Sequence, residues 1–479
     1  SEFANILDII ESTTGRNESI DILKNFFSKN VNNLIPAIYL LNCKIYPDYL
    51  GLEMGVGHTI INKLAKQTSQ KSKSSLTLQN VLDNLRQLVT VKGKDSASKK
   101  RSILQKMIET CTPTELKYLV RIIADGTLRV GLASTSILTA LAYAFKYNDQ
   151  VLIQAYHQYP NYEHLIQSMF SGKQTNATLL TKCKITPSIP FYPMLSTPVN
   201  SFEQVLNLLD SPFTCEYKLD GERAQWHVTP SFVNVFSRRL QNNTDRYMNM
   251  CNILKKNVLK NTVQSIILDS EIVAFDEQTN AILPFQILLK KKNIAFCVFI
   301  FDILYLNGQP LLEVTLEERR KLMYKHISPL KNKFMFVPHI ESRNIKQIKQ
   351  FFNKALENSC EGLMYKLLND THNQYQYQIA HRSTSWLKMK KDYLHIADTF
   401  DLVVIGGYLG KGRRETTYGA YLLACYNKQT QNYESITKVG SGFTQEELHM
   451  QWNTFKKLRI TSPLNNYLLP KTDLPNHFF

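Results

Sequence analysis

Hydrophobic positions in the first part of the chain repeat with the period of an α-helix. Ile137 and Leu141, for example, are four positions apart, which places both side chains on one helix face. Two polar, lysine-rich stretches, Gln70–Ser75 and Val91–Arg101, interrupt the pattern and are expected to be exposed loops. The pattern predicts an all-α domain over residues 1–185.

The pattern changes after a proline-rich stretch at Thr186–Pro198, which we interpret as a linker and domain entry. Residues 186–392 alternate short β-branched or aromatic runs with helical stretches, which is typical of an α+β domain. Residues 393–479 are dominated by strand-like runs separated by glycines and polar turns, at 402–408, 419–426 and 435–440. This last segment predicts a small β-barrel that is incomplete. The fold class is therefore multidomain.

Composition agrees with several folded domains. A chain of 479 residues that is 43% hydrophobic is long enough for about two to four domains. Its 57 basic and 40 acidic residues give a net charge of +17, which favours a polyanionic partner such as nucleic acid. Solubility alone is the alternative explanation of this charge.

Cysteine spacing and apolar runs bear on the compartment. The eight cysteines are scattered singly, without the spacing of a zinc site, so we expect reduced thiols. The most apolar run, Ile294–Phe301, ends at Asp302 and is too short to span a membrane. With no secretory signal at its start, the protein is expected to be intracellular and not membrane-bound.

The octapeptide Glu216–Arg223 carries the most informative chemistry. It begins as a strand in which Glu216 and Lys218 share one face while Tyr217 and Leu219 pack on the other. Asp220-Gly221 then predicts a turn directly after the lysine. A neutral lysine amine is a nucleophile, and burial or neighbouring cations favour that neutral form. An exposed strand end with solvated charges is the alternative.

Two carboxylate groups further along the chain are candidate metal ligands. Asp269 and Glu271 share one face of a predicted strand, so both could point into one pocket and hold a hydrated magnesium ion. Glu361 and Lys366 would lie on opposite faces of a regular strand, so Gly362 or the strand start has to redirect the glutamate. A solvated strand face is the alternative for the first pair.

A pair of lysines is a candidate phosphate site. Lys388 and Lys390 share a strand face with Trp386, so two ammonium groups could bind one phosphate and favour the neutral form of a nearby amine. An ordinary basic surface strand is the alternative. Phe301 lies in a nearly continuous apolar strand, where a core position is its simplest interpretation.

Taken together, these segments resemble the motifs of ATP-dependent DNA ligases. The octapeptide is similar to the nucleophile motif K-x-D-G-x-R, and the later motifs follow in the family's order, at Phe236–Arg238, Leu268–Glu271, Phe299–Asp302, Glu361–Lys366 and Trp386–Lys390. The flanking sequence, such as Phe213–Gln225, is similar to the eukaryotic DNA ligase I class. Gly51–Gly57 and Leu128–Ala133 resemble the family's N-terminal DNA-binding domain, and Asp401–Leu423 resembles the start of its OB-fold.

The resemblance implies a role for each matched residue. Lys218 would be the nucleophile that receives AMP from ATP, and Glu271 and Glu361 would hold Mg²⁺. The implied nucleotide contacts are Glu216, Lys218, Arg223, Arg238, Glu271, Phe301, Lys366, Lys388 and Lys390. Among them Glu216 would contact the adenine, Phe301 would stack on it, Arg223 and Arg238 would contact ribose and phosphate, and Lys366 would contact phosphate.

The same resemblance implies a DNA partner and a cellular role. The expected function is the sealing of nicks in duplex DNA, during replication and repair, by a nuclear monomer with a sliding clamp as an associated partner. Expected DNA contacts are Arg121 and Arg129, which flank a helix junction at Gly126, and Lys411, Arg413 and Arg414 in a glycine-flanked loop. Solvated helix ends are the alternative for the first two.

One feature departs from the family. A late basic motif of the form R-x-P-R-F, which helps orient pyrophosphate, is not found before the chain reaches Phe479. We therefore expect slow self-adenylation with retained nick binding. A catalytically weak nick-binding protein and an RNA capping guanylyltransferase are the alternatives, whereas a P-loop enzyme is disfavoured because no Gly-x-x-x-x-Gly-Lys-Ser/Thr motif occurs.

Overall fold

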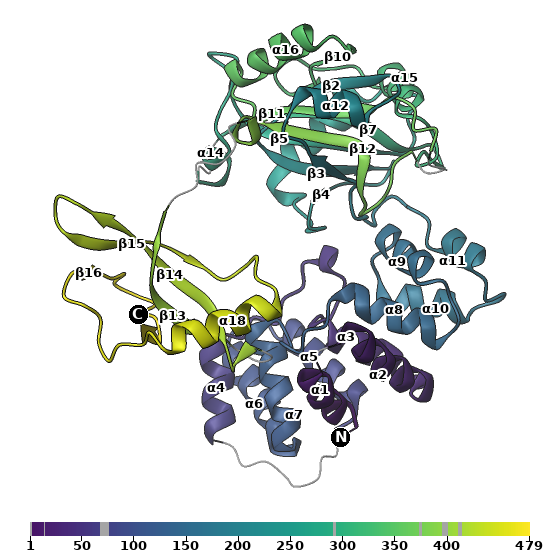
Figure 1. Ribbon diagram of the computed structural model, residues 1–479. Coiled ribbons are helices and arrows are strands. Elements are labelled where there is room, and N and C mark those ends of the chain that lie inside the picture. The colour runs from purple at the N-terminus through teal and green to yellow at the C-terminus, as the bar shows by residue number, and fades with distance from the viewer. Residues whose placement is uncertain are drawn as a thin grey trace.

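The computed structural model describes residues 2–13, 15–67, 76–290, 294–372, 376–394, 401–410 and 414–479. Figure 1 shows a helical region at the lower right, a two-sheet region at the top and a strand-rich C-terminal region at the lower left. This order confirms the predicted fold class, while the exact domain limits stay predictions. Within the described ranges, no helix has the length and apolarity needed to cross a membrane.

The helical region packs around one apolar core that includes Leu23, Leu85 and Leu141. Its helices are α1 (Glu2–Ser12), α2 (Arg16–Lys29), α3 (Leu34–Leu41), α4 (His58–Gln67), α5 (Leu78–Thr90), α6 (Ser96–Thr110), α7 (Pro113–Val120), α8 (Ser134–Ala144), α9 (Asp149–Gln158), α10 (Tyr162–Phe170) and α11 (Asn176–Lys182).

One of the two expected loops is partly wrong. Val91–Arg101 is mostly exposed, but α6 begins at Ser96, because the helix buries Leu104 and Met107 while its lysines face solvent. The other expected loop, Gln70–Ser75, lies entirely outside the described residues.

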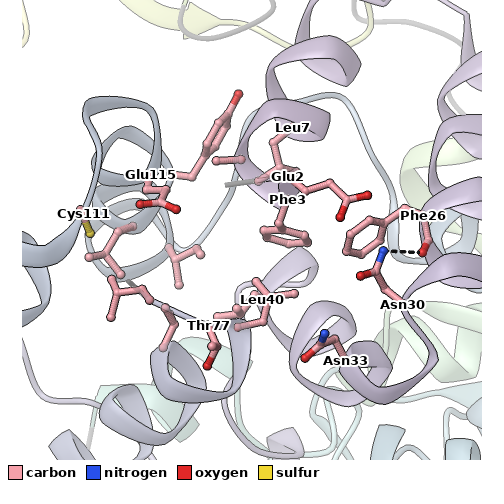
Figure 2. Close-up of a pocket in the computed structure, with 17 residues that line it drawn as sticks. Glu2, Phe3, Leu7, Phe26, Asn30, Asn33, Leu40, Thr77, Cys111 and Glu115 are labelled. Atoms are coloured by element: carbon pink, nitrogen blue, oxygen red, sulfur yellow. Dashed lines mark hydrogen bonds between the residues drawn. The ribbon is translucent and has the colours of Figure 1, made fainter. Parts of the chain in front are cut away.

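The helical region also contains an apolar cavity of about 270 Å³. Figure 2 shows Phe3 and Leu7 of α1, Phe26 of α2 and Leu40 of α3 among the side chains that line it. Glu115 at its rim is already bonded to the backbone of Thr112 in the capping box that starts α7. The cavity shares no lining residue with the cavity between the two sheets described below.

The two-sheet region begins with β1 (Leu195–Pro198) and ends with α17 (Lys391–Leu394). Between them lie α12 (Phe202–Leu208), β2 (Phe213–Lys218), β3 (Glu222–Val228), β4 (Val233–Ser237), α13 (Met248–Ile253), β5 (Ile266–Asp276), β6 (Ala281–Ile282), α14 (Phe285–Lys290), β7 (Ala295–Leu306), β8 (Gln309–Pro310), α15 (Leu316–His326), β9 (Phe334–Phe336), β10 (His339–Ile340), α16 (Ile345–Glu357), β11 (Gly362–Leu367) and β12 (Arg382–Lys390).

These strands form two sheets. The first has the order β1-β12-β11-β2-β10 and the second β4-β3-β5-β7-β8, with β6 on β5 and β9 on β7. The turn at Asp220-Gly221 joins β2 of the first sheet to β3 of the second. A Cβ on Gly221 would collide with the backbone oxygen of Ile272, so this glycine is required for close approach of two backbones. The octapeptide therefore contributes side chains to both sheets.

The C-terminal region contains one five-stranded sheet of order β16-β15-β14-β13-β17. Its elements are β13 (Val403–Leu409), β14 (Tyr418–Asn427), β15 (Asn432–Val439), α18 (Gln445–Lys456), β16 (Tyr467–Leu468) and β17 (His477–Phe478). The three predicted strands are confirmed to within a few residues, and the sheet is an open one in the described residues. Helix α18 was not predicted, although its Thr444 and Glu447 form a capping box that the sequence contains.

A buried histidine predicts acid sensitivity of the two-sheet region. His227 on β3 is fully buried, and burial lowers its pKa to about 3. Its imidazole stays neutral in the folded state but takes up a proton near pH 6.5 when the chain is unfolded. The contribution of His227 to the free energy of unfolding is therefore fully present above pH 6.5 and is lost as pH falls toward 3. Between pH 7 and pH 5 we expect a loss of about 2 kcal/mol. Thermal unfolding of the chain and of His227→Phe across this range tests this, and an equal pH dependence in both would contradict it.

Candidate active site

Strand register across the first sheet brings the two predicted lysine sites together. Gly362 on β11 pairs with Lys218 on β2 and with Lys390 on β12. Paired residues of neighbouring strands point to the same face. Lys218 and Lys390 therefore flank a position without a side chain, and Lys388 projects from the same face of β12.

Gly362 also explains the direction of Glu361. Its φ of +150° is rarely adopted by L side chains, and a Cβ there would collide with the backbone oxygen of Met389. Glu361 lies just before β11 begins, and its backbone N–H donates to the Lys218 carbonyl at 2.8 Å. The expected redirection of Glu361 is therefore present. Its carboxylate forms an ion pair with Lys218 and another with Lys390 at 3.1 Å.

The second sheet separates the two carboxylates that were expected to share a pocket. Asp269 is fully buried and accepts hydrogen bonds from Arg223 Nε at 3.0 Å, Arg223 Nη2 at 2.7 Å and Tyr377 Oη at 2.8 Å. Glu271 lines the open cavity, and Asp269 does not. The expectation that both carboxylates point into one pocket is thus wrong for Asp269, which instead holds Arg223 in place.

A single cavity of about 440 Å³ lies between the two sheets. Every predicted nucleotide or metal residue lines it: Glu216, Lys218, Arg223, Arg238, Glu271, Phe301, Glu361, Lys366, Lys388 and Lys390. These residues are spread over 175 positions of sequence, so the fold gathers them where the motif order predicted a common site. Their individual roles stay predictions.

Two aromatic rings of the cavity lining surround Lys366. The Lys366 ammonium lies 4.2 Å from the ring centroid of Phe301 and 4.3 Å from that of Trp386, and its Nζ is 2.6 Å from Glu216 Oε2. Burial lowers the pKa of Lys366, an effect that the charge of Glu216 opposes. Lys366 therefore packs with a carboxylate and two rings, whereas its predicted partner was a phosphate.

The cavity lining also contains a group of cations around Lys388. Lys388 and Lys390 of β12 are joined there by Arg238, which follows β4, and by Arg382 at the start of β12. Burial lowers the pKa of Lys388, and the positive charges of Lys218, Arg382, Lys390 and Arg238 lower it further. Such a group of cations would bind a polyphosphate.

Glu271 and Glu361 differ in how their environment treats a negative charge. Burial raises the pKa of Glu271 to about 7, with Asp269 and Glu361 adding to the effect and Lys218 and Arg223 opposing it. Burial also opposes ionisation of Glu361, yet its contacts with Lys218 and Lys390 hold its pKa below the usual value. A cation near both would relieve the repulsion between them.

Two carboxylates in one polar cavity fit a hydrated Mg²⁺ that takes its other ligands from water and substrate phosphates. No cluster of three or more His, Cys, Asp or Glu side chains suited to a metal is found in the part of the chain that the structure describes. An ion held by Glu271 and Glu361 alone would need its remaining ligands from water or substrate.

The predicted DNA contacts fall into three groups. Arg129 and Arg414 line one cavity of about 580 Å³ together with the Gly126–Leu132 loop. Arg121 instead pairs with Glu11 at 3.0 Å and donates to the Leu128 carbonyl at 2.9 Å, which braces that loop from inside. Lys411 and Arg413 lie outside the described residues.

Three side chains in or beside the site were not predicted: Arg382 lines the cavity, Tyr377 donates to Asp269, and Arg320 pairs with Glu216. Arg382 has the same strand parity as Lys388, so extending the period-2 pattern would have found it. Tyr377 and Arg320 carry no local signal, because the first lies in a loop and the second in a helix whose sequence Leu-Glu-Glu-Arg-Arg-Lys resembles a solvated face.

Comparison with known proteins agrees with this arrangement. The family models described as "DNA ligase N terminus", "ATP dependent DNA ligase domain" and "ATP dependent DNA ligase C terminal region" match residues 1–72 with 62–142, 193–390 and 414–478, respectively. DNA ligase 1 of Schizosaccharomyces pombe is 37% identical over 98% of this chain and 68% of its own length. DNA ligase 1 of Drosophila melanogaster is 36% identical, covering 99% and 71%.

A solved structure named Pmar-Lig_Pre. shares the fold, with a TM-score of 0.58 at 18% identity over 95% of this chain and 91% of that one. The order of the three regions, the motifs gathered in one cavity and the identity over nearly the whole sequence lead to one conclusion: this chain belongs to the ATP-dependent DNA ligases of the ligase I type.

Proposed function

We propose that this chain seals nicks in duplex DNA through a covalent AMP adduct on Lys218. In the first step Lys218 Nζ attacks the α-phosphorus of ATP, a P–N bond forms and pyrophosphate leaves. The AMP then passes to the 5′-phosphate of a nick, which regenerates the lysine. Attack by the adjacent 3′-hydroxyl joins the strands and releases AMP.

The observation that carries this proposal is one cavity lined by Lys218, by the candidate metal ligands Glu271 and Glu361, and by a group of cations. Lys218 has to lose a proton and leave its ion pair with Glu361 before it attacks. The neighbouring charges of Lys388 and Lys390 would offset charge that develops on the α-phosphate. Mg²⁺, held by Glu271 and Glu361, would supply further neutralisation of the phosphates when bound.

The step-resolved experiment uses labelled ATP followed by nicked duplex. We expect adduct, adenylated DNA and sealed product to appear in that order, with ATP preferred over GTP. Adduct formation from GTP in preference to ATP would contradict the ligase assignment, and sealed product without any preceding adduct would contradict the covalent route.

We further propose that Arg129, Lys411, Arg413 and Arg414 contact the DNA backbone and that Arg121 supports them through the Gly126–Leu132 loop. Arg129 and Arg414 come from the helical and C-terminal regions, respectively, and line the same polar cavity. Backbone contacts of this kind position a nick without reading its sequence.

Replacing Arg129 should weaken nick binding in a salt-dependent way. Loss of one phosphate contact lowers the slope of log affinity against log salt by about 0.9. We expect Arg129→Ala to show this reduced slope in binding titrations at several salt concentrations. Lys354→Ala, which removes an exposed charge on α16, is the matched control. Equal slopes in the wild type and Arg129→Ala would contradict the contact.

The remaining proposals concern the cell. A nuclear monomer that acts in replication and repair, with a sliding clamp as a partner, is what the ligase I type favours.

A further inference from the structure

Glu216 is held by two cations in the cavity between the two sheets. The residue is 1% exposed, yet it lines the cavity. Its Oε2 contacts Lys366 Nζ at 2.6 Å, and its Oε1 pairs with Arg320 Nη2. A buried carboxylate is stable as an ion only when it is paired in this way.

Arg320 reaches Glu216 from outside the cavity. It lies on α15, which packs beside β7, and it is 5% exposed without lining the cavity itself. Its other terminal nitrogen, Nη1, donates to Thr214 Oγ1 at 3.1 Å. Thr214 and Glu216 are two positions apart on β2, so one guanidinium fixes both side chains on the cavity face of the strand.

This arrangement has a consequence for the base that the cavity accepts. An ionised carboxylate only accepts hydrogen bonds. It therefore suits the 6-amino group of adenine, which donates, and repels the 6-oxo group of guanine, which accepts. Arg320 and Lys366 leave part of each oxygen's accepting capacity free, since a carboxylate has about four lone-pair sites.

We propose that Arg320 is a positioning residue for nucleobase selection, which pairs with the Glu216 carboxylate and holds it oriented toward the 6-amino group of the incoming purine nucleotide. This inference rests on the proposed function, in which Glu216 contacts adenine. Helix α15, which lies outside the predicted motifs, would thus take part in the selection of ATP.

The test compares Arg320→Met with wild type on two nucleotides, ATP and purine riboside triphosphate, which has hydrogen in place of the 6-amino group. We expect Arg320→Met to lower kcat/KM for adduct formation with ATP by about 10- to 100-fold, the value of one hydrogen bond to a charged group. The loss should appear mainly in KM, and kcat/KM for the analogue should change little. Arg320→Lys should restore part of the preference.

Lys321→Met is the matched control, because Lys321 is the next residue of α15 and its side chain is 59% exposed. It should leave both nucleotides unaffected. Equal losses for ATP and the analogue in Arg320→Met would show a merely structural role and overturn the proposal, as would an unchanged preference. If Arg320→Met does not fold, the same comparison made on Arg320→Lys decides, with partial loss of the ATP preference expected.

Binding without chemistry separates this inference from the proposed function. Two proteins are compared, the Lys218→Arg variant and the double variant that also carries Arg320→Met. Calorimetric titration of each with ATP and with the analogue measures base selection without chemistry. Absence of adduct in wild type would contradict the proposed function, whereas equal binding losses for the two nucleotides would contradict the role of Arg320.

Discussion

Lys218→Ala is expected to form no adenylated protein from ATP and to seal no nick. In the proposed mechanism the P–N bond forms at the side-chain amine of Lys218. Removal of this amine should therefore lower adduct formation by more than about 10³-fold. Gel detection of the labelled adduct and of sealed DNA measures both losses. A nick already adenylated at its 5′-phosphate should still be sealed, because that last step does not use the lysine as nucleophile.

Lys218→Arg distinguishes the nucleophile from its charge. Arginine keeps a cation next to Glu361, but its guanidinium stays protonated and does not attack phosphorus. We expect this variant to be folded and equally inactive in the first step. Adduct formation by either variant at near wild-type rate would show that another residue carries the AMP.

Gly362→Ala is expected to damage both stability and activity. Its Cβ would overlap the backbone oxygen of Met389 and lie 3.1 Å from Lys390 Cα, at a φ of +150°. Backbone strain and overpacking each cost about 1–3 kcal/mol, so a loss of about 3 kcal/mol or more is expected. Displacement of Glu361 and Lys390 by even about 1 Å can lower the rate by about 100-fold.

Gly308→Ala separates the effect of backbone strain from the effect of the steric collision. Gly308 has a φ of +92°, but a Cβ added there would have no neighbouring atom within 4 Å, so alanine meets strain without a collision. It should cost about 1 kcal/mol and leave adduct formation intact. Thermal unfolding and adduct rates of both variants give the comparison, and similar behaviour of the two would argue against a special role of Gly362.

Period-2 patterns predicted much of the site, because it is built from strands. Parity placed Glu216 with Lys218 and Lys388 with Lys390, and the expected redirection at Gly362 is present. Parity also placed Asp269 with Glu271, but it does not reveal that Asp269 is covered by Arg223 and Tyr377. Which partner neutralises a buried carboxylate depends on packing between sheets.

Residues far apart in sequence account for what was missed. Arg320 meets Glu216 across 104 positions, and the charged sequence of α15 gives no sign that both of its arginines are buried. Local pattern also failed in part at Val91–Arg101. Its lysines correctly predict exposed side chains, but they do not exclude a helix whose other face is packed. A local sequence pattern predicts which side chains share one face of a helix or strand, but not which distant residues pack against that face.

The most direct test of the proposed mechanism is the location of AMP on the protein. The purified chain is incubated with ATP, digested, and the modified peptide is identified by mass spectrometry before and after nicked duplex is added. AMP on Nζ of Lys218, and its disappearance as adenylated and then sealed DNA forms, is the predicted result. AMP on a different residue, or on Lys218 without transfer to the nick, would contradict the mechanism.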